Sequence, residues 1–245
     1  MSPAGEPCPV SAGAVDAAAV LALLPAAAEP VAYVATHRAV RAHLAPPEAL
    51  RDVLPGVDLD ALVAVIALTD PGARRALEWY HLLPAVDRPF GPGAGWALLA
   101  FTAPAHPSRF TDGSRGVWYA GLAPETARAE TRHHLRRQLA RFGEPPQRVP
   151  YQLLRAAIAG LGADLAALPA APRAAVHHPD DYAVSQAVGA ALHARGTDVL
   201  RYDSVRHPGG TCLAALRPRV VLRAEVAGRF AHHWDGERVT TDPGD

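Results

Sequence analysis

The segment from Pro124 to Phe142 constrains the fold more than any other part of the sequence, because both of its ends carry residues that begin or end helices. Proline is favoured in a first helical turn, and an acidic residue beside it suits the helix dipole. Arginines near the other end also suit the dipole, and a glycine followed by prolines ends the segment. We therefore predict one long helix here. The residues that mark its two ends are Pro124, Glu125, Arg136, Arg137, Arg141, Gly143, Pro145 and Pro146.

The rest of the chain alternates short apolar strands with shorter helices, which predicts an α+β fold. Strands are expected at residues 31–40, 96–102, 116–120, 149–158, 198–202, 211–216 and 220–226. Helices are expected at residues 17–24, 59–68, 71–83 and 182–194, with Asp16 capping the first and Asp180 or Asp181 capping the last. Residues 88–95 hold three glycines and two prolines and are expected to form a loop.

The composition of the chain excludes some classes of protein. With 245 residues it is long enough for one large domain. Its 24 arginines, with no lysine, are balanced by 24 acidic residues, so the net charge is zero. A protein that binds nucleic acid through the phosphates needs an excess of positive charge. Direct nucleic-acid binding is therefore not expected.

The two cysteines and the N-terminal segment indicate where the protein works. Cys8 and Cys212 show no metal-binding spacing and no disulfide framework, which favours a reducing, cytoplasmic setting. Residues 1–30 lack the basic region of a signal peptide and carry Glu6 and Asp16 instead. No apolar run reaches the roughly 18 residues that a bilayer requires. Secretion and membrane insertion are not expected.

A glycine-rich segment and three histidine pairs resemble phosphate-binding and metal-binding motifs in composition, but their spacing does not match either kind of site. The glycines of residues 91–95 are not followed by the Lys-Ser/Thr of a phosphate-binding loop. The histidine pairs at 133–134, 177–178 and 232–233 have neither a His-Glu-x-x-His spacing nor a cysteine partner. Surface histidines are therefore expected, and no metal site.

Two further groupings allow both a structural and a functional interpretation. Asp203, Ser204 and His207 crowd into five residues without a Gly-x-Ser-x-Gly elbow, which disfavours a hydrolase triad. Arginines recur at every fourth position from Arg128 to Arg136, on one face of the long helix. This face is either solvated or a surface for an anion or a partner, and the zero net charge favours the solvated face.

Five polar residues that are far apart in the sequence form a more specific pattern. Arg38 lies at the end of the first expected strand, and Arg109 lies in a turn. Tyr119 ends the strand that follows this turn, and Glu130 lies within the first two turns of the long helix. Ser204 follows a later strand and precedes a glycine turn.

This pattern resembles the RES-domain family, named for its Arg, Glu and Ser, over most of the chain from about Val31 to Trp234. The sequence departs from the family at His37, where tyrosine is usual, and at Ser108, where glycine is usual. The elements that carry the resemblance are His37-Arg38, Ser108-Arg109-Phe110, Val117-Trp118-Tyr119-Ala120, Glu125-Thr126-Ala127-Arg128-Ala129-Glu130, and Ser204-Val205-Arg206 followed by Gly209-Gly210.

The resemblance implies both a fold and a division of the chain. The fold would be similar to that of ADP-ribosyltransferases, with a mixed or split β-sheet surrounded by helices. Residues 31–236 would form the catalytic domain, with a helical insertion at 59–83. Residues 1–30 would then be a flexible tail with a short helix, and residues 237–245 a C-terminal tail.

The resemblance also implies that NAD is the substrate and that the bond between nicotinamide and ribose is cleaved. Glu130 would stabilise the ribosyl cation and hold a ribose hydroxyl, while Arg38 and Arg109 would bind the pyrophosphate. Tyr119 would stack on the nicotinamide or position the ribose, and Ser204 would hydrogen-bond the ribose or the carboxamide. Structural alternatives stay open: an ion pair of Arg109 with Glu130, a core position for Tyr119, and a turn-forming role for Ser204.

We therefore expect a toxin-like enzyme that depletes cytoplasmic NAD as a glycohydrolase or phosphorylase. The alternatives are a protein ADP-ribosyltransferase that uses the same site, and a catalytically inactive binding module. The resemblance implies a helix-turn-helix antitoxin as partner, in a toxin–antitoxin complex or beside a homo-oligomer. NAD is expected as substrate and no metal as cofactor. The sequence does not determine whether water, phosphate or a protein accepts the ADP-ribose.

Overall fold

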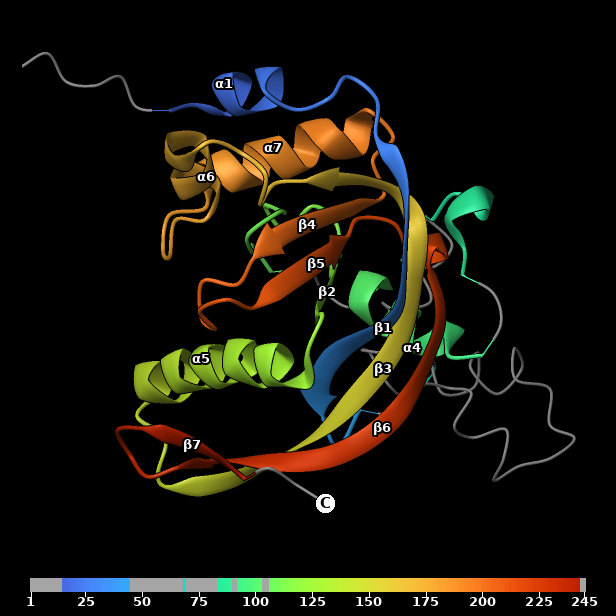
Figure 1. The fold of residues 1–245 in the computed structure, drawn as a ribbon. Helices are drawn as coiled ribbons and strands as arrows, with labels where there is room; N and C mark the ends of the chain where they lie inside the picture. Colours follow the sequence, from blue (N-terminus) through green and yellow to red (C-terminus); the bar gives the residue numbers. More distant parts are fainter. Residues whose placement is uncertain (1–14, 45–67, 69–82, 90–91, 103–105, 243–245) are drawn as a thin grey trace, which may run out of the picture.

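The computed structural model describes residues 15–44, 68, 83–89, 92–102 and 106–242. The helices expected at 59–68 and 71–83, and the first part of the N-terminal tail, lie almost wholly outside these residues. The fold of the described residues is α+β, as the sequence predicts, with helices packed on both sides of one mixed sheet (Figure 1).

Seven strands form the sheet, in the order β1-β2-β5-β4-β3-β6-β7. Neighbouring strands pair in antiparallel fashion except β3 and β4, which are parallel. The strands are β1 (Glu29–Arg41), β2 (Trp118–Gly121), β3 (Gln147–Asp164), β4 (Val199–Asp203), β5 (Thr211–Ala215), β6 (Val221–Trp234) and β7 (Val239–Asp242).

The long strand β3 joins two parts of the sheet. It pairs with β1 along one edge and with β6 along the other, up to the pair of Ile158 with Val221. Beyond that pair, Gly162 to Asp164 of β3 pair with β4 instead. Because β1 also reaches β2 through the pair of His37 with Gly121, strands β1, β2, β5, β4 and β3 form a closed ring of pairings. Strands β6 and β7 extend the sheet from this ring.

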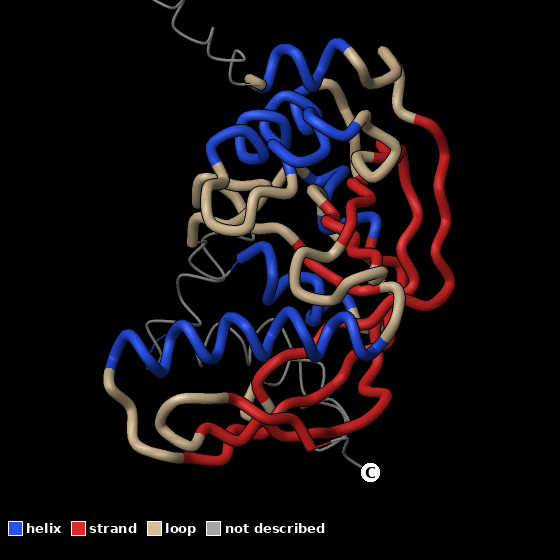
Figure 2. Tube along the Cα trace, turned by 60° about the vertical axis from the view of Figure 1, so that its left-hand side comes forward, coloured by secondary structure: helices blue, strands red, loops and turns tan. Residues whose placement is uncertain are grey.

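Helices pack against the sheet in three places (Figures 1 and 2). Helices α1, α6 and α7 lie together beside β4, and α4 packs behind β2. Helix α5 crosses the molecule between the loops at the ends of β4 and β5 and the strands β3, β6 and β7. The helices are α1 (Ala17–Ala22), α4 (Ala94–Thr102), α5 (Pro124–Phe142), α6 (Ala170–Val176) and α7 (Ala183–Ala194), with short 3-10 turns at Ala85–Asp87 and Pro218–Val220.

In each of these three places the helices pack on the sheet around a separate cluster of buried hydrophobic residues. Around α7 the buried residues include Val188, Leu192 and Leu200, and around α4 they include Trp96 and Trp118. The third cluster fills the space between α5 and the strands β3 and β6. Burial of apolar surface on this scale is the main stabilising contribution to such a fold. The residues of the third cluster are Ala127, Leu135, Leu139, Val149, Tyr151, Leu153, Phe230 and Trp234.

The best-defined sequence signals are confirmed. Helix α5 runs from Pro124 to Phe142, and Gly143 ends it with a left-handed φ of 62°. Asp16 caps α1 by accepting a hydrogen bond from the backbone N–H of Ala19. Six of the seven expected strands appear as β1 to β6, with β3 and β6 longer than the local pattern indicates. The expected cap of α7 is wrong: the helix begins at Ala183 with Tyr182 as its N-cap, and Asp181 only accepts a hydrogen bond from the backbone N–H of Ala183 just before the first turn.

The strand expected at residues 96–102 is wrong, because this segment forms helix α4. Every side chain in the run except the last is apolar, and such a run has no periodicity that separates strand from helix. The way residues 96–102 pack against the sheet determines that they form a helix. Gly93 has a φ of 85° and lies so close to β6 that a Cβ there would be 2.0 Å from the carbonyl oxygen of Ala224. Helix α4 can therefore start directly on the sheet.

The C-terminal residues 237–245, expected as a tail, include strand β7, which pairs with the end of β6 from Trp234–Val239 to Ala231–Asp242. Residues Ala231 to Trp234 of β6 pair with β3 on one edge and with β7 on the other, so β7 becomes the outermost strand of the sheet. None of the helices in the described residues combines the length and apolarity that a membrane crossing requires.

Candidate active site

Glu130 and Ser204 meet at the junction of α5 with the end of β4. The Ser204 hydroxyl lies 2.6 Å from Oε1 of Glu130. The same hydroxyl oxygen accepts hydrogen bonds from the backbone N–H groups of Arg206 at 3.2 Å and His207 at 3.0 Å. Because both backbone groups are donors, the hydroxyl proton must point at the carboxylate. Ser204 therefore both organises its turn and donates to Glu130.

The two oxygens of the Glu130 carboxylate have different surroundings. Oε1 also lies 3.8 Å from Sγ of Cys212. Burial, followed by the nearby Glu130 charge, raises the pKa of the Cys212 thiol to about 12, so this thiol is protonated and donates to the carboxylate. Oε2 has no hydrogen-bond partner, and Glu130 forms no ion pair, in the part of the chain that the structure describes. One oxygen is held and the other is available.

Arg109 is buried, with 8% of its surface exposed. Its Nη1 donates to the carbonyl oxygens of Val176 at 2.9 Å and His178 at 3.0 Å, and its guanidinium carbon lies 4.7 Å from the centre of the Tyr182 ring. Among the described residues, no ion pair joins it to Glu130. The structural alternative in which these two residues pair is therefore not observed, and Arg109 instead fixes the segment that follows α6.

Tyr119 holds the turn that carries Arg109. Its hydroxyl accepts a hydrogen bond from the backbone N–H of Phe110 at 3.0 Å and shares a second one with the Ser108 hydroxyl at 2.9 Å. Burial raises the pKa of Tyr119, so the phenol stays neutral. The serine that replaces the usual glycine at position 108 is thus part of this contact.

Arg38 reaches the same region from β1. Its Nη1 donates to the carbonyl oxygen of Tyr119 at 3.0 Å, and its guanidinium lies 4.8 Å above the Trp118 ring. Burial lowers its pKa to about 10, which leaves it charged at neutral pH. Among the described residues, Arg38 forms no ion pair with Glu130.

The buried Tyr202 shows that the other site residues form one cluster. Burial raises its pKa, the negative charge of Glu130 acts in the same direction, and the positive charge of Arg109 acts in the opposite direction. The contacts agree: the Phe110 ring, next to Arg109 in the sequence, lies 6.5 Å from the ring of Tyr119 and 5.0 Å from that of Tyr202. Ser204, just after the strand that carries Tyr202, bonds to Glu130. Arg38 joins the cluster only through Tyr119.

Several polar residues of this region were not singled out by the sequence. Arg206 donates to the carbonyl oxygen of Pro179 and lies 3.9 Å from Asp180, while Gln186 donates to the carbonyl oxygen of Ser108 at 3.0 Å. Thr126 bonds to His207. Thr126 and Arg206 stand in the elements that carry the family resemblance and His207 in the disfavoured triad, but no contact was predicted for any of them or for Gln186 of α7.

The suspected hydrolase triad does not form. His207 directs Nδ1 to Thr126 at 2.9 Å, and Ser204 donates to Glu130 and not to a histidine. The Asp203 backbone N–H donates to Nε2 of His177. The disfavoured interpretation of Asp203, Ser204 and His207 is therefore excluded by the hydrogen-bond pattern.

Two of the histidines expected at the surface have structural roles. His232 is wholly buried, which corrects the expectation, and it bonds to Thr131 at 3.1 Å and Thr241 at 2.9 Å. His177 bonds to the carbonyl oxygen of Arg173 at 2.6 Å through Nδ1. No group of three or more His, Cys, Asp or Glu side chains that could hold a metal ion occurs within the described ranges.

The arginine face of α5 is partly engaged. Arg128 lies 3.8 Å from Glu125 and 5.4 Å from the Phe230 ring, and Arg136 donates to the carbonyl oxygen of Glu237 at 3.4 Å. Arg132 is exposed to solvent. The face is mainly solvated, as expected.

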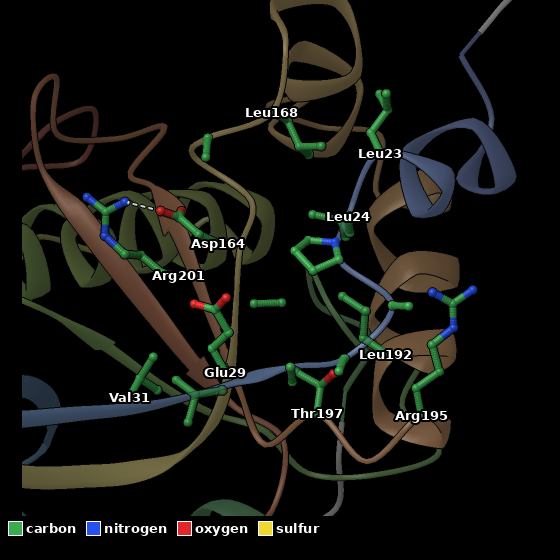
Figure 3. A pocket seen from close by; sticks show the side chains of 18 of the residues that line it. Leu23, Leu24, Glu29, Val31, Asp164, Leu168, Leu192, Arg195, Thr197 and Arg201 are labelled. Carbon is green, nitrogen blue, oxygen red and sulfur yellow. Dashed lines mark hydrogen bonds and ion pairs between the residues drawn. The ribbon is translucent and has the colours of Figure 1, made fainter.

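A cavity of about 370 Å³ lies away from the candidate site, between the α1–β1 connection, the end of β3 and α7 (Figure 3). Leu24, Leu168 and Leu192 contribute apolar walls. Asp164 and Arg201 form an ion pair of 2.7 Å beside it. None of the five predicted site residues lines this cavity. It therefore does not bear on the site around Glu130.

Comparison with known proteins places this site in a family. No curated protein matches the chain. A structure titled as the crystal structure of the M. tuberculosis MbcT–MbcA toxin–antitoxin complex is similar, with 12% identity, a TM-score of 0.42, and coverage of 88% of this chain and 90% of that chain. The RES domain family matches residues 78–235, which include Arg109, Tyr119, Glu130 and Ser204 but not Arg38. Since this match spans well over half of the sequence, the chain belongs to the RES domain family.

Proposed function

We propose that this protein consumes NAD by breaking the bond between nicotinamide and ribose, and that it acts as a growth-arresting toxin. The observation that carries the proposal is the Glu130 carboxylate, which has Oε1 held by Ser204 and Oε2 without a partner in the described chain. Membership in the RES domain family supports it, because NAD consumption by toxins is what the resemblance to that family implies.

The chemistry suits a single carboxylate. Nicotinamide in NAD is cationic, so when the C1′–N bond breaks its electron pair passes to the nitrogen and neutral nicotinamide leaves without a proton donor. The ribose is left as an oxocarbenium ion, which an adjacent anion stabilises. Oε2 of Glu130 is suited to accept a hydrogen bond from the 2′-hydroxyl, while Ser204 keeps Oε1 in place. An acceptor oxygen then bonds to C1′ and loses its proton.

The arginines are suited to the pyrophosphate. Arg109 uses Nη1 for two carbonyl oxygens and Arg38 uses Nη1 for one. Each guanidinium keeps other N–H groups for phosphate oxygens, and a planar guanidinium can donate two of them side by side. Because the Tyr119 hydroxyl is engaged by its turn, the ring is the part of Tyr119 that we assign to the nicotinamide.

The biological setting follows from the same proposal. We infer a cytoplasmic toxin that is held inactive by a helix-turn-helix antitoxin covering the site. The proposed acceptor of the ADP-ribose is water or phosphate. A crystal structure of the toxin with its antitoxin that leaves Glu130 accessible would contradict the inhibitory arrangement.

The decisive experiment measures nicotinamide release and NAD loss by the purified protein and by Glu130→Gln. We expect the variant to lose at least about 100-fold in kcat, because the charge that stabilises the transition state is removed while the size is kept. The matched control is Glu125→Gln, on the same helix with an exposed carboxylate, which should keep wild-type activity.

The outcomes separate the proposed reaction from its rivals. A fully active Glu130→Gln protein would refute the role of this residue. No NAD loss from folded wild type would contradict the glycohydrolase and the phosphorylase alike. Labelled NAD in a cell lysate then distinguishes the rivals: label on a protein band indicates ADP-ribosyl transfer, and no label indicates a binding module.

A further inference from the structure

The turn that carries Ser204 is attached to helix α5 at two points. One is the bond from Ser204 to Glu130. The other is a bond of 2.9 Å between Nδ1 of His207 and Oγ1 of Thr126, whose residue is wholly buried. Thr126 and Glu130 are four residues apart, so both attachment points lie on the same face of the helix, one turn from each other. The two bonds therefore fix the turn in position and in rotation.

The turn itself is held by its own backbone. Ser204 N–H donates to the carbonyl oxygen of Gly210 at 2.8 Å, and Gly210 N–H donates to the carbonyl oxygen of His207 at 2.8 Å. The His207 N–H donates to the Ser204 hydroxyl. A displacement of the His207 side chain is thereby passed through one residue of backbone to the hydroxyl that holds Oε1 of Glu130.

Gly210 is required for space, since its φ is not in the left-handed region. A Cβ at this position would lie 2.6 Å from Nδ1 of His207 and 2.8 Å from Oγ1 of Thr126. Any side chain there would collide with both atoms of the bond. The second glycine of the Gly209-Gly210 pair thus permits the contact between the turn and the helix.

We propose that His207 is a positioning residue, which acts through Ser204 to fix the orientation of the Glu130 carboxylate and does not itself touch the substrate. This inference rests on the proposed NAD-consuming function and names a residue that the family resemblance does not assign. The bond to Thr126 sets where Ser204 sits on Glu130, and so which carboxylate oxygen is left for the ribose.

The first test compares His207→Ala with His207→Asn. The alanine variant removes the bond, and kcat for nicotinamide release should fall about 10- to 100-fold with KM for NAD little changed, because misplacement of a catalytic group by about 1 Å has effects of that size. Asparagine carries a polar atom at the position of Nδ1, so it should recover most of kcat. The matched control is His233→Ala, since His233 is partly exposed and bonds only to Asp242.

Substitutions at Thr126 and Gly210 should also break the hydrogen bond between His207 and Thr126. Thr126→Val and Gly210→Ala should each lower kcat to a similar extent, and the Thr126→Val, His207→Ala double variant should be no worse than either single variant, since both remove one interaction. Additive losses would contradict a shared bond. Inactivity of His207→Asn together with a raised KM would show that the imidazole touches the substrate, and wild-type kcat in His207→Ala would also overturn the proposal.

Hydrogen exchange tests the attachment without any assumption about the reaction. In His207→Ala the amide protons of Ser204, Arg206 and Gly210 should exchange at least about tenfold faster than in wild type, while that of Leu139, in the second half of α5, should not change. If wild type does not consume NAD, the proposed function fails but this measurement still decides whether His207 holds the turn. Unchanged exchange in the turn would refute the positioning role on its own.

Discussion

The two buried carboxylates Asp87 and Asp198 and the partly buried carboxylate of Glu130 are partnered in opposite ways. Asp87 and Asp198, with 5% and 3% of their surfaces exposed, face Arg217 and Arg219. Arg219 lies 3.0 Å from Asp87 and 2.7 Å from Asp198, and Arg217 lies 3.0 Å and 3.5 Å from the same two residues. Glu130, by contrast, has neutral donors on one oxygen only.

This difference in partners distinguishes the charges of Asp87 and Asp198, which stabilise the fold, from the carboxylate of Glu130, which has an oxygen left to bind a substrate. In a buried ion cluster the carboxylate oxygens are taken up by their partners. Removal of one charged member leaves the others buried without a counter-charge, which strongly destabilises the fold. A carboxylate held on one oxygen by a hydroxyl and a thiol leaves its other oxygen for a ligand. The ion cluster should therefore respond to substitution in stability, and the Glu130 site in turnover.

The largest expected effect lies in the ion cluster. Asp198→Asn should lower the free energy of unfolding by about 3 kcal/mol, the low end for a broken buried pair, because Arg219 keeps about a third of its side chain exposed. Glu130→Gln should change it by less than about 0.5 kcal/mol. Urea unfolding of the two variants measures both. Equal losses in the two would remove the distinction between the clusters.

Ser204→Ala is expected to have the next largest effect, and on turnover. Without the hydroxyl, Oε1 of Glu130 keeps only the weak thiol contact, and kcat for nicotinamide release should fall about 10- to 100-fold. Ser185→Ala is the matched control, because Ser185 is also buried and its hydroxyl donates to the carbonyl oxygen of Tyr182. It should lose only about 1 kcal/mol of stability and no turnover. A Ser204→Ala enzyme with wild-type kcat would show that the carboxylate needs no orientation.

The effect that is smallest at neutral pH, and grows only in acid, concerns His232, a buried side chain whose lowered pKa keeps it neutral at pH 7. Burial, followed by the charge of Arg132, lowers its pKa to about 4, whereas in the unfolded chain it is near 6.5. The unfolded state therefore binds the proton first, and stability should decrease as the pH falls from about 6.5 to about 4. In urea titrations across this range His232→Gln should show a shallower decrease. Parallel curves for variant and wild type would contradict this assignment.

The sequence predicts the fold where the signals are local. Pro124, Gly143 and Asp16 mark helix ends through contacts within a few residues, and these predictions are confirmed. It fails at residues 96–102, because the choice between strand and helix there depends on the approach of Gly93 to β6, more than 130 residues away. The full lengths of β3 and β6 depend likewise on partners distant in the sequence.

The candidate site shows the same limit. Arg38, Arg109, Tyr119, Glu130 and Ser204 were predicted by resemblance to a family, and their types alone do not indicate which of them meet. The structure shows that Ser204 lies on Glu130, that the Tyr119 hydroxyl is used by its own turn, and that Arg109 holds the segment after α6. His207 and Thr126 were missed as partners because 81 residues separate them.

The ring of strand pairings has a consequence for the order in which the sheet and the candidate site assemble during synthesis. Strand β1 is among the first elements to leave the ribosome, but its antiparallel partner β3 begins more than 100 residues later. At translation rates of roughly 5–20 residues per second, β1 waits about 5–20 s for that partner. The turn with Ser204 follows later still, so a nascent chain carries Glu130 well before it carries the group that orients it. The proposed orientation of the Glu130 carboxylate is therefore absent until the chain has been synthesised past Ser204.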